Sequence, residues 1–453
     1  MGASKFFRRG KPAWTEARQP DKKKEKRRRN QGRGGEERRG EGLRHVGEVL
    51  PLPRRQRSLA GDPRRPYPQI LMKRLYDEVC RHGNRKPNPL VLDLLPDEDK
   101  PPGDLAFHAA GNNRHTFEKS LRILPPDISC ITELFLGFPK WSAVITALDF
   151  SYNFIGDAGA EELARLLPEA IKRAGLAHLR AFDVSLNPLH KKGGLAAAAL
   201  IEKTAHKGDD GANGGRSKVM LQELRLASCE LEVDSVVAIA ERLALANRTL
   251  RVLDVSNPRL FSLQADLSEH YARMVRMNPT LETVHVAKQR LGDEGTRILV
   301  QGLLENRTLR CLDLKANNIS ITGASHLATL LRADSNLETL ILRANPIQDE
   351  GVGHISHALW YNRSLRHLDC GMCALTGKGV CQVADAIERN TTIERLELFE
   401  NAWDEDSAQR FHEVLEGVQN RLTPLALDFL PYCVPVKPHD INMQYFVAAR
   451  SLD

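Results

Sequence analysis

The residues whose type and spacing could most readily bind a metal or carry out redox chemistry are two cysteines, Cys370 and Cys373, with two residues between them. A Cys-x-x-Cys pair has the spacing of half a zinc site or of a dithiol redox centre. A complete zinc site needs a second pair of ligands, and no such pair follows in the sequence. Cys80-Arg-His82 is equally isolated. We therefore interpret these side chains as core residues and predict neither metal ligands nor a redox centre.

Phosphate-binding and nucleophilic motifs are also missing. A loop of the form Gly-x-x-x-x-Gly-Lys-Ser/Thr does not occur in the sequence. Gly377-Lys-Gly379 lies in a predicted turn, and Gly32-Arg-Gly-Gly35 lies in a polar N-terminal tail, so neither is expected to hold a phosphate. Nothing groups a Ser, a His and an Asp. The sequence therefore predicts no catalytic residues and no cofactor.

One repeated pattern specifies the elements that position these residues. The motif apolar-x-x-apolar-x-apolar starts at Leu281, Leu309, Leu337, Leu365 and Ile393, in four steps of 28 residues. A fixed period of this size indicates one supersecondary unit stacked on copies of itself. From Leu312 to Leu314 the pattern alternates as in a half-buried strand, and from Ile319 to Leu331 it has helical spacing. Each unit is predicted to be a short strand, a turn and a helix.

The same register extends in both directions. Further copies start at Ile145, Leu179, Leu221, Leu250 and Leu422, which makes about ten units over residues 144–428. Two steps are longer, at 34 and 42 residues. The second contains the Gly-rich polar stretch Lys207–Arg216, which is predicted to loop out of the stack.

Two other positions of the unit carry a signature. Position nine is Asn153, Asn187, Cys229, Asn317, Asn345, Cys373 and Asn401, and a buried Asn there can satisfy backbone groups of the turn. Six residues later stand Gly159, Gly193, Gly295, Gly323, Gly351 and Gly379, expected to let the helix start pack closely under the strands. This pattern resembles the ribonuclease-inhibitor-type leucine-rich repeat, a class that includes the repeats of NOD-like receptors and of the Ran GTPase-activating protein. The resemblance implies an α/β solenoid curved as a horseshoe, with parallel strands on the concave face and helices on the convex face.

Positions two, three, five, seven and eight of each unit are expected to point into the horseshoe. Position two alternates in sign, as Glu282, Arg310, Glu338, Arg366 and Glu394. Neighbouring strands lie about 4.8 Å apart, so opposite charges would lie side by side. We expect this charge ladder to set register and solubility and not to bind a partner.

Position five is mostly acidic: Asp149, Asp183, Arg225, Asp254, His285, Asp313, Ile341, Asp369 and Glu397. Two interpretations stay open. The aspartates can bond turn amides, or they can form an acidic stripe that attracts a basic partner. Lys315 and Arg343, at position seven, would interrupt the stripe. Phe399, also at position seven, is predicted to be an exposed aromatic and the best single hot-spot candidate.

Charge is distributed unevenly along the chain. Residues 1–66 contain 21 Lys and Arg against 8 Asp and Glu, whereas residues 67–453 contain 44 against 50. The first segment is poor in apolar residues and is predicted to be a disordered basic arm. Its basic cluster is Lys22, Lys23, Lys24, Lys26, Arg27, Arg28 and Arg29. Three roles are compatible with it: an RNA contact, a nuclear address, or a contact with an acidic protein surface such as a microtubule.

The regions flanking the repeats are expected to cap the stack. Residues 67–143 are assigned to an N-terminal cap with a helix from Ile70 to Val79, a strand over Leu90–Leu95 and a short helix over Phe117–Leu124. Residues 429–453 are assigned to a C-terminal cap or tail. Asn247, Asn306, Asn362 and Asn390 match glycosylation acceptors, but we interpret them as left-handed residues in helix C-terminal turns.

Eight cysteines without an apolar signal segment indicate a reducing compartment, and no apolar run approaches the ~20 residues of a membrane span. We predict a non-catalytic scaffold whose concave face binds a protein, while the basic arm contacts an anionic structure such as a microtubule, RNA or an acidic protein. The resemblance implies a cytoplasmic assembly, with a cytoskeletal, ciliary or nuclear location as options. The alternatives are a regulator of a small GTPase and an inhibitor of a basic enzyme such as a ribonuclease.

Overall fold

The computed structural model describes residues 71–95, 105–109, 122–137, 144–172, 178–205, 221–259, 267–333, 335–417, 425–436 and 443–450. The chain divides into two units, Met1–Arg65 and Pro66–Asp453, and all described residues belong to the second. The predicted basic arm with its cluster Lys22–Arg29, and the Gly-rich stretch Lys207–Arg216, lie outside the described residues.

The second unit contains one parallel sheet of eleven strands in sequence order. The strands are β1 (Leu105–His108), β2 (Ile145–Asp149), β3 (Ala181–Asp183), β4 (Glu223–Arg225), β5 (Val252–Asp254), β6 (Thr283–His285), β7 (Cys311–Asp313), β8 (Thr339–Ile341), β9 (His367–Asp369), β10 (Arg395–Glu397) and β11 (Ala426–Leu427). Equal positions of successive units face each other, as Leu312 faces Val284 and Leu340. The predicted α/β solenoid is therefore confirmed.

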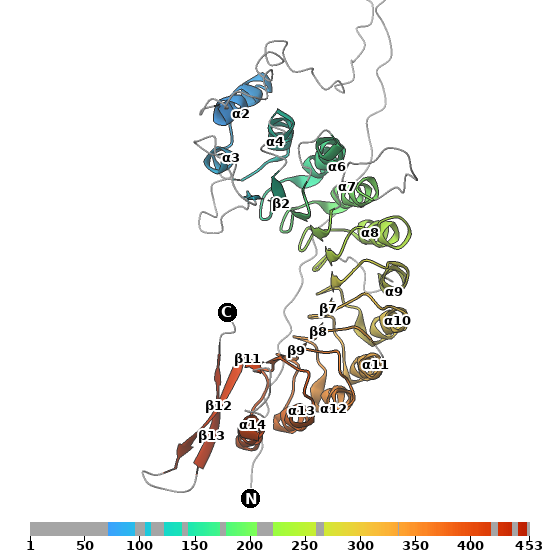
Figure 1. Ribbon diagram of the computed structural model, residues 1–453, viewed down its shortest axis with the longest axis vertical. Coiled ribbons are helices and arrows are strands. Elements are labelled where there is room, and N and C mark those ends of the chain that lie inside the picture. Colours follow the sequence, from blue (N-terminus) through green and yellow to red (C-terminus); the bar gives the residue numbers. More distant parts are fainter. Residues whose placement is uncertain are drawn as a thin grey trace, which may run out of the picture. The chain divides into compact units, whose positions relative to one another are not determined.

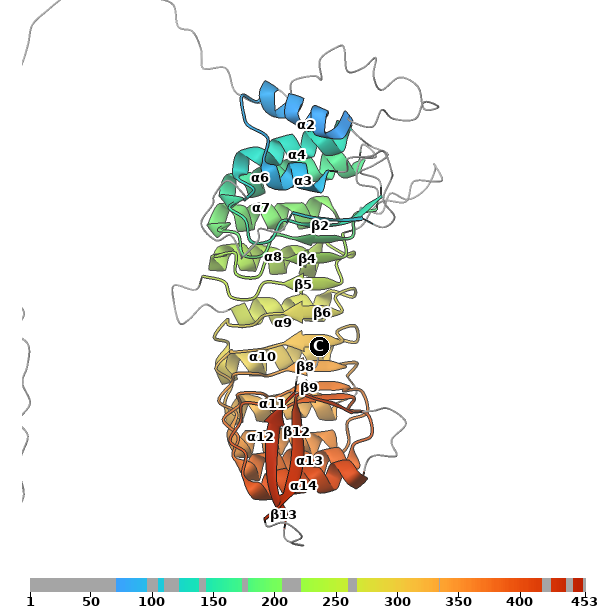
Figure 2. The ribbon, with the colours of Figure 1, turned by 90° about the vertical axis from the view of Figure 1, so that its left-hand side faces the viewer.

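A helix follows each strand from β2 to β10. The helices are α6 (Gly156–Lys172), α7 (His190–Lys203), α8 (Val233–Leu245), α9 (Leu267–Met277), α10 (Gly292–Leu304), α11 (Ile321–Arg332), α12 (Gln348–Leu359), α13 (Gly377–Arg389) and α14 (Glu405–Gly417). Within this unit the strands line the inner side of an arc and the helices its outer side (Figure 1). Figure 2 shows the repeats stacked in order along the long axis. The core lies between the two layers, where residues such as Leu312, Leu314 and Leu327 are buried.

The stack begins one unit earlier than the sequence pattern predicts. Strand β1 pairs with β2, and α4 (Pro125–Gly137) packs against α6. Helix α2 (Leu71–His82) confirms the helix predicted from Ile70 to Val79. The strand predicted over Leu90–Leu95 is wrong, because these residues fall largely in helix α3 (Pro89–Leu94). Pro89 occupies the first turn and the Asn88 side chain accepts a hydrogen bond from the Leu90 amide at 3.0 Å, which is a standard helix start.

Another difference concerns the helix predicted over Phe117–Leu124. Residues 117–121 lie outside the described part, and residues 122–124 precede α4 without helical structure. At the other end of the stack, β12 (Phe429–Pro435) and β13 (Met443–Ala449) form an antiparallel hairpin that contacts α14. The rings of Trp403, Phe411 and Phe429 pack together there, with centroids 4.9–5.4 Å apart.

Asparagines at position nine join each unit to the one before it. Nδ2 of Asn345 donates to the carbonyls of Leu314 (3.0 Å) and Leu342 (2.7 Å), and Oδ1 accepts from the amides of Asn317 (2.8 Å) and Ile319 (3.0 Å). Its side chain is fully buried, so these bonds satisfy backbone groups that water does not reach. This confirms the role predicted for position nine.

Cys373 occupies the same position and is structural. Its Sγ donates to the carbonyl of Leu342 at 3.3 Å, and its amide donates to Oδ1 of Asn401 at 2.9 Å. The hydrogen bond with Cys373, together with burial, raises the pKa of the Cys370 thiol. Such a thiol is a poor source of thiolate, which is the form that binds metals and attacks disulfides.

A second series of buried asparagines lies in the turn before five of the strands, β5, β6, β7, β9 and β10. Nδ2 of Asn306 donates to the carbonyl of Val275 at 2.6 Å, and its Oδ1 accepts from the amides of Thr308 (2.9 Å) and Leu309 (2.8 Å). Asn247, Asn278, Asn362 and Asn390 make equivalent bonds. The predicted left-handed conformation is wrong, because none of these residues has a positive φ. Their amides are buried between successive units.

The repeated glycine has a different neighbour from the one predicted. A Cβ on Gly323 would lie 2.5 Å from Oδ1 of Asp293 and 2.6 Å from Cγ2 of Ile319. Oδ1 of Asp293 accepts hydrogen bonds from the amides of Ser320 (2.7 Å) and Gly323 (2.9 Å). The carboxylate of one unit thus caps the helix of the next unit. The glycine makes room for this contact between helix starts and not for a contact with the strands.

The left-handed conformation occurs instead at position eight, just after each strand. Leu186, Ala316, Ala344 and Met372 all have φ between 52° and 61°. This geometry turns the amide of each residue toward the next unit, as the Ala316 amide bonds to the carbonyl of Arg343 at 2.9 Å. A residue with a Cβ is disfavoured in this conformation, so the turn stores a small amount of strain.

Candidate functional site on the concave face

Alternation along each strand creates the inner wall. In the unit that starts at Leu281, Leu281, Val284 and Val286 are buried, whereas Glu282 and His285 are partly exposed. Successive side chains of a strand point to opposite faces. Because the strands lie on the inner side of the arc (Figure 1) and their apolar side chains face the helices, we infer that the polar ones line the inner surface. The wall is a continuous surface formed by side chains of many units.

The charge ladder at position two consists of discrete pairs. Nη1 of Arg251 lies 2.6 Å from Oε1 of Glu282, Arg310 pairs with Glu338, and Arg366 pairs with Glu394. In every case an arginine contacts the glutamate of the following unit, which confirms the predicted proximity of opposite charges. These side chains are roughly half exposed, so each pair contributes at most about 1 kcal/mol to stability.

The aspartates at position five bond the turn that follows the strand. Oδ1 accepts from the amide two residues later in Asp149, Asp183, Asp254, Asp313 and Asp369, at 2.8–2.9 Å. This geometry supports the structural interpretation of the aspartates. The hydrogen bond does not remove the charge of the carboxylate. Whether the aspartates also form an acidic stripe for a basic partner therefore depends on what else each carboxylate contacts.

In the C-terminal half of the wall the acidic residues have basic neighbours. Nδ1 of His285 lies 3.2 Å from Oδ2 of Asp313, and Nε2 of His367 lies 2.9 Å from Oε1 of Glu397. Arg343 lies 3.8 Å from Asp369 and also pairs with Glu400. Lys315 lies in the turn after β7 and is partly exposed. Burial lowers the pKa of His367, so this histidine does not neutralise Glu397, but Nε of Arg395 lies 2.7 Å from Oε1 of Glu397. Arginines therefore compensate Asp369 and Glu397, whereas the neighbour of Asp313 is a histidine.

The N-terminal half is different. Asp149 and Asp183 face each other in adjacent strands, and Asp254 lies two strands beyond Asp183. Among the described residues, neither Asp183 nor Asp254 has a basic group within ion-pair distance. Burial raises the pKa of Asp183 from its ordinary value. Arg225, which separates these aspartates in the sheet, pairs with Glu223 of its own strand at 3.3 Å. Negative charge on this wall is thus concentrated at β2, β3 and β5.

The exposure predicted for Phe399 needs a correction, while its role as a hot spot stays a prediction. Phe399 is partly buried and packs against the core. Exposed apolar side chains lie after β2 and β3, where Phe154 is 38% and Leu186 50% exposed, and after β9, where Met372 is 49% exposed. The Arg122 guanidinium lies over the rings of Tyr152 (4.1 Å) and Phe154 (4.7 Å). The sequence signal was a large apolar residue at position eight (Leu186), where five units carry Ser, Asn, Lys or Ala, and at position ten (Phe154), where the other units carry no large apolar residue.

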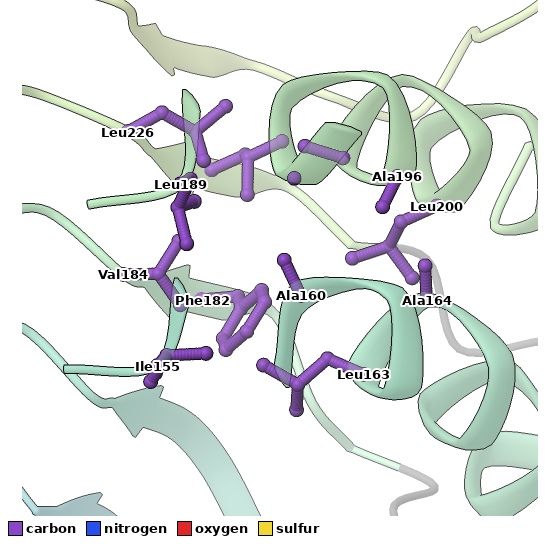
Figure 3. A pocket seen from close by; sticks show the side chains of 13 residues that line it. Ile155, Ala160, Leu163, Ala164, Phe182, Val184, Leu189, Ala196, Leu200 and Leu226 are labelled. Carbon is purple, nitrogen blue, oxygen red and sulfur yellow. The ribbon is translucent and has the colours of Figure 1, made fainter. Parts of the chain in front are cut away.

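A small apolar cavity lies under the same units. Its volume is about 20 Å³, and Figure 3 shows it between α6, α7 and the strand layer, lined by residues such as Ala160, Leu163, Phe182 and Leu200. This is close to the space of one water molecule, and the lining offers no polar partner to hold water. We interpret it as a packing gap and not as a ligand site. The described residues also include no group of three or more His, Cys, Asp or Glu that could hold a metal ion.

Comparisons with known proteins agree with the repeat pattern. A family model described as a leucine-rich repeat matches residues 142–164, 305–328 and 333–356. The chain is 27% identical to mouse leucine-rich repeat-containing protein 34 over 56% of this chain and 62% of that protein. It is 28% identical to pig ribonuclease inhibitor over 44% of this chain and 39% of that protein. The chain therefore spans less than two-thirds of either relative.

A chain in the solved structure of the yeast Rad7 and Elc1 complex matches over 76% of this chain and 84% of that chain, with a TM-score of 0.36 and 15% identity. Separately, none of the described helices is long and apolar enough to cross a membrane.

Proposed function

Because the chain is built from leucine-rich repeats of the ribonuclease-inhibitor type, we propose that it is a non-catalytic scaffold whose concave face binds a basic protein partner. The observation that carries this proposal is the acidic wall formed by Asp149, Asp183 and Asp254, in which Asp183 and Asp254 have no basic group within ion-pair distance among the described residues. A wall with one sign of charge attracts a partner of the opposite sign and increases the rate of association.

Apolar side chains next to this wall complete the proposed contact. Leu186 and Phe154 lie at the same edge as Asp149 and Asp183, and both are exposed. Charge pairs at an interface contribute mainly to rate and specificity, whereas apolar anchors contribute most of the affinity. We therefore propose that the partner meets units β2 to β5, with basic residues against the aspartates and an apolar residue against Leu186.

The same chemistry suits an inhibitor of a basic enzyme, which is the second candidate. The specific observation in its favour is the 28% identity to ribonuclease inhibitor. Both candidates need a basic surface on the partner, and they differ in whether binding blocks an active site. Loss of activity of a captured enzyme on titration with this chain would identify the second candidate.

The experiment that tests the proposal removes charge without removing the turn bond. Asn in place of Asp keeps the oxygen that accepts the turn amide and loses the negative charge. A triple variant Asp149→Asn/Asp183→Asn/Asp254→Asn and a control Asp313→Asn/Asp369→Asn would be used to capture partners from native extract. The proposal expects the triple variant alone to lose the basic partner. Equal capture by the triple variant and the unmodified chain would contradict it.

A further inference from the structure

A second surface of opposite charge lies where the chain enters β5, β6 and β7. A groove of about 290 Å³ is lined there by Gln222, Arg248, Thr249, Arg251, Pro279, Thr280, Glu282, Arg307, Thr308 and Arg310. Its lining contains four arginines and a single acidic residue. The groove is thus strongly basic, although residues 67–453 as a whole carry more acidic than basic residues.

Two of the arginines are fixed by the backbone. Nη1 of Arg248 donates to the carbonyls of Leu243 (3.1 Å) and Asn247 (2.8 Å), and Arg307 makes the equivalent bonds to Leu304 (2.9 Å) and Asn306 (3.0 Å). Each guanidinium closes the C-terminal end of its helix, where a positive charge is favoured. Because these side chains are already ordered, a ligand that binds them pays little further entropy.

The hollow between them has a simple cause. Arg248 and Arg307 occupy the same position of the repeat, two units apart, and the unit between them has Pro279 at this position. A proline ring is much shorter than an arginine side chain, so its unit leaves a gap between two ordered guanidinium groups. The hydroxyls of Thr249 and Thr280 donate to the carbonyls of Leu221 and Leu250 at 3.0 Å. The arginines are therefore the main donors that remain for a ligand.

The remaining two arginines of the groove, Arg251 and Arg310, each pair with a glutamate. Arg251 pairs with Glu282 at 2.6 Å, and Arg310 pairs with Glu338, which is not part of the lining. Both arginine side chains are more than half exposed. A guanidinium has five N–H donors in a planar fork, so one carboxylate partner does not use its full capacity. Exposed pairs of this kind are weak and can exchange partners.

We propose that this groove binds an acidic, extended segment of a protein, whose carboxylates lie between Arg248 and Arg307 and against Arg310. Carboxylates match the guanidinium fork in a bidentate arrangement. A nucleic acid fits less well, because the lining offers no aromatic ring for base stacking. The inference goes beyond the concave-face proposal and does not depend on it, since the two surfaces select ligands of opposite charge.

The repeat itself supplies a matched control. Arg363 donates to the carbonyls of Trp360 (3.1 Å) and Asn362 (2.9 Å), as Arg307 does to the carbonyls at the end of its helix. Arg366 pairs with Glu394, as Arg310 pairs with Glu338. Arg310 and Arg366 are 57% and 56% exposed. Neither Arg363 nor Arg366 lines the groove. The variants Arg307→Glu/Arg310→Glu and Arg363→Glu/Arg366→Glu therefore change the same contacts and the same charge, inside and outside the groove.

The probe is a ten-residue peptide of alternating Glu and Ser with a photoreactive end group, added to the full chain at low salt. The readout is the cross-linking yield at residues 222–310, so capture by the basic segment 1–66 is counted separately. We expect at least a tenfold loss of yield in Arg307→Glu/Arg310→Glu and less than a twofold change in the control pair. In Glu282→Gln, which removes the one acidic group, we expect a severalfold gain that misfolding cannot mimic.

Three outcomes would overturn the inference. One is an equal loss in the two arginine variants, which would indicate attraction to overall charge. Another is no groove cross-link in the unmodified chain together with no gain in Glu282→Gln. The third is tighter competition by a single-stranded oligonucleotide than by the peptide, which would assign the groove to nucleic acid.

Discussion

Oδ1 of Asn345 accepts a hydrogen bond from the backbone amide of Asn317 at 2.8 Å, so the asparagine of one unit completes the turn of the unit before it. Oδ1 of Asn317 does the same for the amide of Gln289 at 2.9 Å. Stability of the stack therefore depends on contacts between neighbouring units, as in other repeat proteins. Loss of one such residue weakens two units at once.

The first prediction concerns this ladder. Asn345→Ala should lower the free energy of unfolding by about 3 kcal/mol, because it leaves several buried backbone groups without a partner. Asn336→Ala removes an exposed side chain whose hydrogen bond to the Arg307 carbonyl is open to water, and should change the free energy of unfolding by less than about 0.5 kcal/mol. Urea unfolding followed by circular dichroism would measure both. Similar losses in the two variants would show that burial of the asparagine is not the cause.

The second prediction concerns the glycine between helix starts. Gly323→Ala should cost about 1–3 kcal/mol, since its Cβ would overlap Asp293 and Ile319. Gly417→Ala is the control, because a Cβ there meets no atom within 4 Å. Thermal unfolding would compare the two variants. A neutral Gly323→Ala would mean that the helix starts can separate without loss of stability.

The left-handed turn gives a prediction of the opposite sign. Ala344 has φ of 61°, a conformation that costs an L-residue about 1 kcal/mol and glycine very little. Ala344→Gly should therefore raise the free energy of unfolding by up to about 1 kcal/mol. Ala238→Gly, within helix α8, should lower it by about 1 kcal/mol. If both substitutions destabilise equally, the turn is not strained.

A pH prediction follows from Asp369. Burial raises the pKa of Asp369 to about 6, against about 3.9 in an unfolded chain. Between these values the folded chain binds more protons, so this group stabilises the fold at low pH and its contribution is lost as pH rises to 6. The nearby Arg343 favours the charged form, whereas Glu397 and Asp428 oppose it.

The matching variant is Asp369→Asn, which keeps the oxygen that accepts the Gly371 amide. It should raise the free energy of unfolding at pH 7 by up to about 2–3 kcal/mol and leave it nearly unchanged at pH 4. Unfolding curves at the two pH values would give the difference. A larger gain at pH 4 than at pH 7 would contradict the sign of the argument.

The sequence was sufficient for the fold because a 28-residue period leaves one way to bury each strand and helix. The repeat pattern predicted Asn317 and Asn345 correctly, and it predicted the pairing of Arg310 with Glu338. It missed Gln289, which replaces the asparagine through a longer side chain that bonds Val255 and Tyr271. It also missed β1, since the first unit departs from the consensus that later units share.

Features that depend on contacts between units were harder to predict. The strand expected at Leu90–Leu95 is a helix because Asn88 and Pro89 start one, a local signal that outweighs the short apolar run. Phe399 is partly buried because it packs against the core, and the repeat pattern does not predict this contact. The basic arm's partner, the cytoskeletal or ciliary setting and the role as a GTPase regulator stay predictions.

The most direct test of the acidic concave wall is a binding measurement with a purified partner identified by capture. Isothermal titration calorimetry would compare the unmodified chain, Asp149→Asn/Asp183→Asn/Asp254→Asn and the control Asp313→Asn/Asp369→Asn. The account predicts that the first variant binds at least tenfold more weakly, with a smaller dependence on salt, and that the control binds within about twofold of the unmodified chain. Unchanged affinity in the first variant, or an equal loss in the control, would contradict it.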